Sequence, residues 1–442
     1  MRRSSVIFTI VGLLVAVVLG GQGKPPSQLV HESGEINIIA FIKSNDGNVF
    51  EGVKKALDYL SEAGGGTVNF PPGNYTVKLP GVRGRSNDIK NMWAVGDNTR
   101  IKLDQGAKII ADATSDSYIL FSFRGKNSGL EGGTLVGDRG IPTPNIGTLV
   151  QVQSAFDTTI RHVNIENAGL DGITVSGGSG APSVRTRIVD VDIKNSKRNN
   201  LSIINAEYIW VEQSSFTSAG GDDGADPQDG IDVEPNKHTW ARNIWITDCQ
   251  FDNNGGNGLH IISGVAGRDA NGAAATSGVN VTGCSFENNG SVGVNVQVVD
   301  QVKIVNCRTK RTTGPASISY ALTDVSSGIV TGCEALRVVG GTAIYCQGIY
   351  DVVIANNHQL QGRVRVGDAA NVSKPRSKRS ARVIIEANNI SSIGEGIVMA
   401  ATDNSSIHSN VIRSSGLPIA VKSSNQIDVR GNNLNGVSQP AP

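Results

Sequence analysis

The chain has 442 residues, a net charge of +1 and hydrophobic side chains at 38% of its positions. This balanced charge excludes a typical nucleic-acid-binding protein, because no excess of basic residues is present to displace counterions from phosphates. Glycine occupies 54 positions, well above the roughly 7% of an average protein, and aromatic residues are few, which favours short strands joined by tight turns.

The first segment has the pattern of a secretory signal. Arg2 and Arg3 precede an apolar stretch at 6–19, and small residues follow at 20–23. Because the apolar stretch is too short to cross a bilayer, we expect a cleaved signal at 1–23 and a secreted, periplasmic or extracellular protein. No later segment is apolar for long enough to span a membrane, and we take residues 24–35 as a linker.

Residues 36–78 predict a helix and the first strands. The segment 48–66, "NVFEGVKKALDYLSEAGGG", places its apolar residues on one helical face and ends in three glycines. The residues on this face are Val49, Phe50, Val53, Ala56, Leu57 and Leu60. An amphipathic helix of this kind would cap the open end of a repetitive fold, which otherwise exposes core and unpaired strand edges.

The chain from 79 to 436 is repetitive. A pattern of apolar-x-x-(Cys/Asn/Val/Ser)-x-apolar recurs eleven times, from "IRHVNIEN" at 160–167 to "VRGNNLNG" at 429–436, in steps of 22 to 35 residues. Apolar runs of period 2 separated by Gly and Asn indicate strands. One such unit cannot bury its apolar face, but stacked units can. The sequence therefore predicts an all-β parallel β-helix (solenoid) of roughly a dozen or more coils, followed by a tail at 437–442.

Stacking also explains the cysteines. One repeat position is occupied by Cys249, Cys284, Cys307 and Cys333 in turn, and then by Asn357, Asn388, Asn410 and Asn432. Coils stack ~4.8 Å apart, so we expect a thiol ladder that continues as an asparagine ladder. A straight stack does not give the tetrahedral convergence of a zinc site. A disulfide between adjacent rungs stays open, and Cys346, in another strand, makes the count odd.

Three stretches carry a resemblance to a known family. The segment 44–77, "SNDGNVFEGVKKALDYLSEAGGGTVNFPPGNYTV", and the segments "DNTRIKLDQGAKI" and "LEGGTLVGDRG" at 97–109 and 130–140 are similar to the pectin-lyase-like superfamily. Within it they most resemble the branch of polygalacturonases and phage tailspike-type depolymerases. The resemblance covers residues 36–436 and implies a right-handed β-helix that acts on polysaccharide.

The strand "DGIDVEP" at 229–235 directs Ile231 and Val233 inward and Asp232 and Glu234 outward. Aligning the equivalent strands predicts two outward columns, and the first of them contains no arginine. The first holds Thr174, Ser202, Asp232, His260, Asn295, Ser319 and Tyr345, and the second holds Ser176, Ile204, Glu234, Ile262 and Gln297.

The acidic coil is the candidate site. Six carboxylates fall within residues 222–234, and this coil and the next both have 35-residue steps. We expect two long loops to form the walls of a groove over Asp232 and His260, since functional residues concentrate on such loops. A solvated surface pair of Asp and His is the simpler alternative.

Glycoside hydrolysis is the leading chemistry. Asp229, Asp232 and Glu234 would supply the acid and the base, because inverting enzymes hold two carboxyls ~6.5–9.5 Å apart, and His260 would orient one of them or bind the sugar. Further substrate contacts are expected from Ser202, Asn295, Gln297, Trp240, Lys237 and Tyr345.

The resemblance to polygalacturonases implies a role for one residue, but the sequence departs from the polygalacturonase motifs at three points. "PQDGID" at 227–232 is similar to their Asn-Thr-Asp pattern, which implies a catalytic acid at Asp229. Asn257 stands where the next acid of that pattern is expected, His260 has no flanking glycines, and no Arg-Ile-Lys follows.

Two other functions stay open. A lyase or uronate epimerase would use His260 or Tyr345 as base and Arg198 or Lys237 to bind the sugar acid. Ca²⁺ would then be bound by Asp222, Asp223 and Asp226, because it prefers several oxygen ligands. A non-catalytic glycan-binding solenoid would use sugar-stacking residues such as Trp210, Trp240 and Trp245. The basic stretch 373–380 is taken as a solvated loop, and the oligomeric state is left open.

Overall fold

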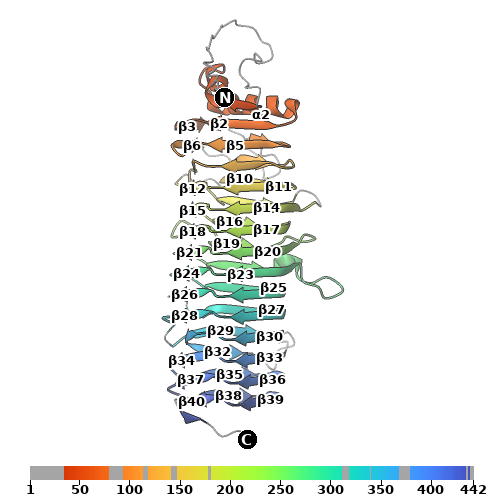
Figure 1. Ribbon diagram of the computed structural model, residues 1–442, viewed down its shortest axis with the longest axis vertical. Helices are drawn as coiled ribbons and strands as arrows, with labels where there is room; N and C mark the ends of the chain where they lie inside the picture. Colours follow the sequence, from red (N-terminus) through yellow and green to blue (C-terminus); the bar gives the residue numbers. More distant parts are fainter. Residues whose placement is uncertain are drawn as a thin grey trace, which may run out of the picture.

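Short strands stacked in parallel make up the computed structural model (Figure 1), as the repeats predict. The structure describes residues 34–78, 93–112, 118–140, 147–177, 181–310, 318–338, 340–367, 379–434 and 437–438. The expected signal and most of the linker lie outside these residues, as does 373–378 of the basic stretch. No described helix has the length and apolar character needed to span a membrane.

Each coil contributes a strand to up to three stacks, which we call A, B and C in the order in which the chain passes through a coil. Stack A comprises β4 (Trp93–Val95), β7 (Tyr118–Phe123), β10 (Gly147–Gln153), β13 (Ile173–Ser176), β16 (Leu201–Ile203), β19 (Ile231–Val233), β22 (Leu259–Ile262), the first parts of β25 (Val294–Val305) and β27 (Ile318–Thr331), β29 (Thr342–Gln347), β32 (Arg363–Val366), β35 (Ile397–Ala400) and β38 (Ile419–Lys422).

Stack B forms the second face. It comprises β1 (Glu35–Asn37), β2 (Gly66–Phe70), β5 (Thr99–Leu103), β8 (Gly129–Glu131), β11 (Phe156–Arg161), β14 (Ser183–Val189), β17 (Ala206–Glu212), β20 (Ala241–Thr247), β23 (Thr276–Thr282), the second parts of β25 and β27, β30 (Tyr350–Ala355), β33 (Ser380–Glu386), β36 (Thr402–His408) and β39 (Asn425–Arg430). Because β25 and β27 run through both stacks, A and B together form one 26-stranded sheet.

Stack C closes the coils. It comprises β3 (Gly73–Lys78), β6 (Ala107–Asp112), β9 (Thr134–Val136), β12 (Asn164–Glu166), β15 (Asp192–Lys194), β18 (Ser215–Thr217), β21 (Gln250–Asp252), β24 (Ser285–Glu287), β26 (Arg308–Lys310), β28 (Glu334–Leu336), β31 (Gln359–Gln361), β34 (Asn389–Ser392), β37 (Val411–Ser414), β40 (Asn433–Leu434) and the antiparallel β41 (Val437–Ser438). The 15 strands of this sheet confirm a dozen or more coils.

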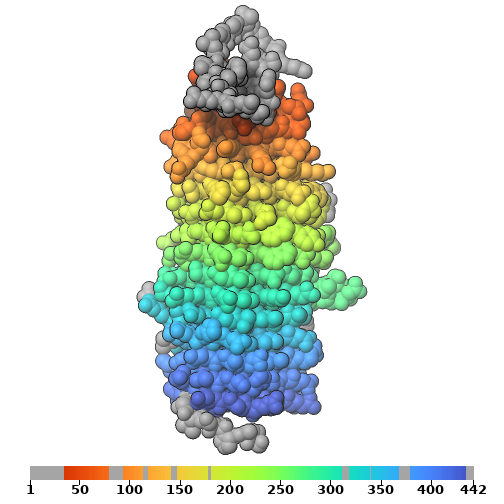
Figure 2. All heavy atoms as spheres, in the orientation of Figure 1, coloured from red at the N-terminus to blue at the C-terminus, as the bar shows by residue number. Residues whose placement is uncertain are grey.

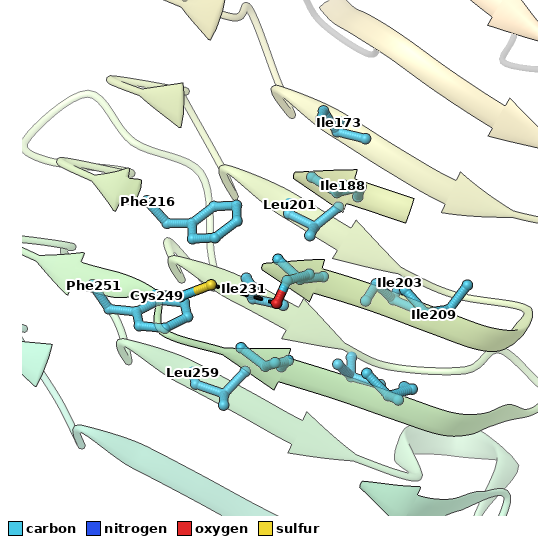
Figure 3. Packing of buried hydrophobic residues seen from close by; sticks show 14 of the residues in the cluster. Ile173, Ile188, Leu201, Ile203, Ile209, Phe216, Ile231, Cys249, Phe251 and Leu259 are labelled. Atoms are coloured by element: carbon cyan, nitrogen blue, oxygen red, sulfur yellow. Dashed lines mark hydrogen bonds between the residues drawn. The ribbon is translucent and has the colours of Figure 1, made fainter. Parts of the chain in front are cut away.

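Like residues stack on like residues inside the solenoid. Ile173, Leu201, Ile231 and Leu259 occupy one register position in β13, β16, β19 and β22, and all are fully buried (Figure 3). On the opposite stack the ring of Phe251 lies between two others, with centroids 5.3 Å from Phe216 and 4.7 Å from Phe286. Each coil thus buries its apolar face against the next, and burial of this kind supplies most of the stability.

The thiol and asparagine ladders are confirmed. All five cysteines are buried and free, and the backbone N–H of Cys333 donates to Asn357 Oδ1 at 2.8 Å. From there, side-chain amides bond in sequence, with Asn357 to Asn388 at 2.8 Å and Asn388 to Asn410 at 2.9 Å. The asparagine ladder therefore hydrogen-bonds successive coils through the interior of the solenoid.

The N-terminal helix caps the first coil as expected. Helix α2 (Val49–Ala63) follows the shorter α1 (Ile38–Lys43), begins at the N-cap Asn48 and ends at Gly64, whose φ of 86° only glycine adopts without strain. Five of the six residues predicted for its apolar face are buried, and Val49 is partly buried.

Candidate active site on stack A

The strand register confirms the core of the first outward column. Thr174, Ser202, Asp232, His260 and Asn295 pair in succession along β13, β16, β19, β22 and β25. Asp232 and His260 therefore lie on neighbouring rungs. We call these five residues the central column.

Beyond Asn295 the predicted column needs two corrections. The next rung is Ala321, and Ser319 is fully buried. Strand alternation predicts which face a residue occupies, but a register shift of two residues leaves the face unchanged. The pattern alone therefore placed Ser319 where the structure has Ala321. The expectation of no arginine is also wrong, because Arg365 of β32 pairs with Tyr345. Arg365 and Tyr345 lie far from Asp232, since Tyr345 is three rungs, ~14 Å, beyond His260.

A second polar column lies at the corner where each coil enters stack A, and the sequence reasoning missed it. Each member accepts a hydrogen bond from the backbone N–H of the next, at 3.3 Å for Asp171, 2.9 Å for Asn199 and 2.5 Å for Asp229. Its members are Asp171, Asn199, Asp229 and Asn257, all buried. The signal was present, because an Asp or Asn precedes each of these strands by two residues. We call this set the corner column.

The two columns meet at His260. Its Nδ1 lies 3.2 Å from Asp229 Oδ2 and 3.3 Å from Asp232 Oδ1. Asp229 has no exposed surface, Asp232 is 6% exposed, and the His260 side chain is 15% exposed. We call these three residues the carboxylate–imidazole group. Among the described residues, no other three His, Cys, Asp or Glu side chains converge closely enough to bind one ion.

Burial and charge shift the pKa values of Asp229, His260 and the nearby Glu234. Burial raises the pKa of Asp229, although His260 opposes this. Burial disfavours charged His260, but the two facing carboxylates outweigh it and raise the pKa of His260 to about 10. Burial and then the charge of Asp232 raise the pKa of Glu234. Such shifts are common at functional sites, where charges are gathered against their solvation cost.

Glu234 lies at the opposite edge of stack A, at the corner that leads to stack B. It is half-buried, and its backbone N–H donates to Ile203 O at 3.0 Å. Gly264, in the 3₁₀ turn η3 (Gly264–Ala266), packs so closely that a Cβ atom there would lie 2.8 Å from Glu234 Cγ and Oε1. The turn of the following coil therefore holds the Glu234 side chain in place.

Two long loops border stack A at this level, as predicted. Residues 219–230 lead into β19, and residues 263–275 leave β22, where they project from the side of the solenoid (Figures 1 and 2). The second loop is tied down by Arg268, whose guanidinium contacts Asp300 at 2.8 Å and Asp324 at 3.1 Å. The first is tied down by Arg139, which contacts Asp223 at 2.5 Å.

The residues predicted to bind calcium are not brought together. Asp222, Asp223 and Asp226 are all exposed, and Asp223 already pairs with Arg139. Because they do not converge within the described residues, the acidic loop does not form the predicted Ca²⁺ site.

The remaining predicted contacts are spread over the same region. Ser202 is buried in the central column, whereas Asn295 and Gln297 are half-exposed in β25. Lys237 is exposed, and Trp240 half-buried, in the turn between β19 and β20.

The two other tryptophans occupy a different face. Trp210 and Trp245 stack on stack B with centroids 5.3 Å apart, and Arg187 lies over the Trp210 ring. They therefore lie outside the site on stack A.

Arg198 lies beside the carboxylates but is already bound. Its Nε and Nη2 donate to the two carboxylate oxygens of Asp171 at 2.8 and 2.5 Å. This bidentate geometry uses the guanidinium face that would otherwise recognise a carboxylate. Two surface concavities, of about 430 and 390 Å³, are not lined by the carboxylate–imidazole group or by Glu234. One lies around Asp190 and Asp248, and the other lies around Asp138 and reaches Asp223 of the acidic loop.

Comparison with known proteins settles the fold. The family model described as a right-handed beta helix region matches residues 227–374. Together with the parallel strand stacks, this match shows that the chain folds as a right-handed parallel β-helix. Two curated relatives from Bacillus subtilis strain 168, the SPbeta prophage-derived uncharacterized protein YorA and the uncharacterized protein YclG, are each 26% identical to it, over 48% and 42% of the chain. The matches span only 40% and 35% of those relatives' own lengths.

Solved structures with this β-helix fold share little sequence with the chain. The A-module of the Azotobacter vinelandii mannuronan C-5 epimerase AlgE4 has a TM-score of 0.59 at 17% identity, covering 87% of this chain and 96% of that one. The Dettilon tailspike protein gp208 has a TM-score of 0.56 at 13% identity, covering 88% and 68%. PfbA, a surface adhesin of Streptococcus pneumoniae, has a TM-score of 0.52 at 14% identity, covering 87% and 91%. At these identities the likeness establishes the β-helix fold alone.

Proposed function

We propose that this β-helix hydrolyses glycosidic bonds of a polysaccharide that lies over stack A, with the chemistry at Asp229, Asp232, Glu234 and His260. The observation that carries the proposal is the convergence of two buried carboxylates and an imidazole where the corner column meets the central column. Glu234 follows Asp232 by two residues, and the charges of Asp232 and His260 act on it. The mannuronan epimerase module, a structural neighbour whose name includes a polysaccharide, supports a glycan as the substrate class.

The β-helix does not need these charges for its stability. Other rungs of the central column carry Thr174, Ser202 and Asn295, which fill the same position without charge. Burying ionisable groups costs several kcal/mol each in desolvation, which their mutual attraction only partly offsets. Their convergence across two neighbouring rungs therefore favours a catalytic role over a purely structural one.

The geometry suggests separate roles for the acids. Glu234 is accessible and its raised pKa favours the protonated form, so it would donate a proton to the leaving oxygen. Asp232 and His260, at the floor of the site, would activate the attacking water. Asp229 has no exposed surface, so it would position His260 and not contact the sugar, unlike the catalytic acid that the resemblance implied.

The neighbouring rungs would bind the flanking sugars. Asn295 and Gln297 continue the outward columns beyond His260 with half-exposed amides. Lys237 and Trp240 border the site on the corner turn, while Ser202 would contribute to its floor and Tyr345 to a distant sugar position.

Elimination or epimerisation at a uronate is the second candidate. Arg198 favours it, because a cation beside Asp232 and Glu234 would attract a sugar carboxylate. Asp171 already binds that guanidinium, and the surplus of carboxylates would repel an anionic sugar, so we rank hydrolysis first. The adhesin PfbA illustrates a third possibility, a β-helix that attaches to surfaces.

Mass spectrometry of the products tests these alternatives. The purified chain is incubated with a panel of neutral and uronic polysaccharides, and we expect fragments that have gained one water. Asp232→Asn and Glu234→Gln should lose this activity, and Asp222→Asn, an exposed acid of the same coil, should keep it. Unsaturated, ultraviolet-absorbing fragments would establish elimination in place of hydrolysis. Full activity in Glu234→Gln would remove that residue from the mechanism.

A further inference from the structure

Within the part of the chain that the structure describes, the three facing atoms of the carboxylate–imidazole group have no hydrogen-bond partner. His260 Nδ1 lies 3.2 and 3.3 Å from Asp229 Oδ2 and Asp232 Oδ1, yet neither contact has the geometry of a hydrogen bond. Buried polar atoms in native proteins almost always have a partner. Two unpartnered carboxylate oxygens on side chains more than nine-tenths buried, both directed at one ring nitrogen, therefore require something else at their centre.

The outer oxygens of the same carboxylates are held by amides. Asp229 Oδ1 accepts from the backbone N–H and the side-chain Nδ2 of Asn257, at 2.5 and 3.0 Å. Asp232 Oδ2 accepts from Asn199 Nδ2 at 3.3 Å. In each carboxylate, hydrogen bonds thus hold one oxygen in place, and the other oxygen faces His260 Nδ1. Supporting hydrogen bonds of this kind orient the carboxylate ligands of metal ions.

We propose that Asp229 Oδ2, Asp232 Oδ1 and His260 Nδ1 bind a divalent first-row transition-metal ion such as Zn²⁺ or Mn²⁺. Zinc binds nitrogen and carboxylate oxygen at ~2.0–2.2 Å, which places tetrahedral ligands about 3.3–3.5 Å from one another. The observed separations of 3.2 and 3.3 Å match this spacing. A mixed nitrogen and oxygen set of three ligands is unlike Ca²⁺, which takes six to eight oxygens.

Charge balance supports the same ion. Two carboxylates and a neutral imidazole carry a charge of −2, which a divalent cation cancels in full. A single proton on His260 would leave one uncompensated buried charge, and such charges are costly. The free coordination position would lie on the side where His260 and Asp232 are slightly exposed, and it would hold the water that attacks the sugar. This catalytic role rests on the proposed hydrolysis, whereas binding of the ion does not.

Cobalt substitution tests the site without any substrate. The purified full chain is stripped with chelator and titrated with Co²⁺, and the bound metal is counted by elemental analysis. We expect one ion per chain, with visible absorption bands that report a nitrogen and oxygen environment, and displacement of Co²⁺ by Zn²⁺. Asp229→Asn and His260→Gln should weaken binding by 100-fold or more. Asp222→Asn is the control. It removes a carboxylate of the same coil that lies outside the group, and it should bind Co²⁺ like the wild type.

The outcomes separate the metal site from the proposed function. No stoichiometric Co²⁺ or Zn²⁺ on the folded wild-type chain would overturn the metal site, as would unchanged binding in both variants. Binding of one ion without cleavage of any polysaccharide would support the site and contradict the hydrolase. Cleavage that survives complete removal of metal would support the hydrolase and overturn the catalytic role of the ion. Circular dichroism confirms that each variant is folded.

Discussion

Asp229 Oδ2 lies 3.2 Å from His260 Nδ1, although Asp229 belongs to the corner column and His260 to the central column. The same carboxylate binds Asn257 through its other oxygen. Asp229 thus links the corner column to the outward face of stack A. Because two of its neighbours in the corner column are asparagines, a carboxylate is not needed to continue the hydrogen-bonded ladder, and its negative charge serves the contact with His260.

Two replacements of Asp229 separate its hydrogen bond to Asn257 from its charge interaction with His260. Asp229→Asn keeps an acceptor for Asn257 but loses the charge, so we expect a loss of 100-fold or more in kcat/KM with little change in Tm. Asp229→Ala also leaves the Asn257 N–H unpaired and should destabilise the fold by about 1–3 kcal/mol. Denaturant unfolding and polysaccharide hydrolysis, measured on both variants, check this. Equal unfolding free energies for the two would contradict the structural half of the argument.

The central column was predictable from the sequence because strand alternation and repeat spacing are local properties. "DGIDVEP" and "NGLHIIS" align by their Gly and apolar positions, and this alone places Asp232 beside His260. The alignment failed at Ser319, where β27 follows a stretch without a comparable Gly marker. It also left out β32, although the alternation in "RVRV" at 363–366 points Arg365 outward.

The contact of Asp229 with His260 was not predictable in the same way. It depends on how the coil turns at the corner, where a backbone N–H of the next coil holds one carboxylate oxygen and so directs the other. The proximity of Gly264 to Glu234 likewise depends on the path of an inserted loop. Loop conformation is not fixed by a repeat pattern, which explains why the carboxylates of the acidic loop looked like metal ligands in the sequence and do not converge in the structure.

Gly264→Ala tests whether the position of Glu234 matters. Its Cβ would lie 2.8 Å from Glu234 Cγ and Oε1, so the carboxyl must move, and we expect kcat to fall at least tenfold. Gly267→Ala is the matched control, because Gly267 has a similar φ of 59° but no atom within 4 Å of the added Cβ. Both variants place an alanine at a positive φ and so strain the backbone, and only Gly264→Ala also displaces the acid. Equal kinetics in the two variants would show that the Glu234 position does not limit the reaction.

Arg268→Ala should loosen the loop 263–275. The guanidinium contacts both Asp300 and Asp324 and donates to Gly272 O at 2.9 Å, so its loss removes the contacts that join the loop to the next two coils. We expect KM to rise more than kcat falls, because the loop borders the site and carries none of the proposed catalytic residues. Limited proteolysis should show new cleavage in this loop. Arg308→Ala, an exposed partner of Glu334, is the control and should change neither measurement.

Asn388→Ala tests the asparagine ladder as a source of stability. The Asn388 amide donates to Asn410 Oδ1 at 2.9 Å and to Ile354 O at 2.9 Å, and it accepts from Asn357 Nδ2 at 2.8 Å. Its removal leaves several buried groups unpaired, each of which costs about 1–3 kcal/mol. We therefore expect a clear drop in the unfolding midpoint. Asn389→Ala removes an exposed amide one residue away and should change the midpoint little. Since solenoid coils contact only their neighbours, hydrogen exchange of backbone amides should rise around β33 and β36. Polysaccharide hydrolysis on stack A should be unaffected. A uniform rise in exchange along the chain would contradict this prediction.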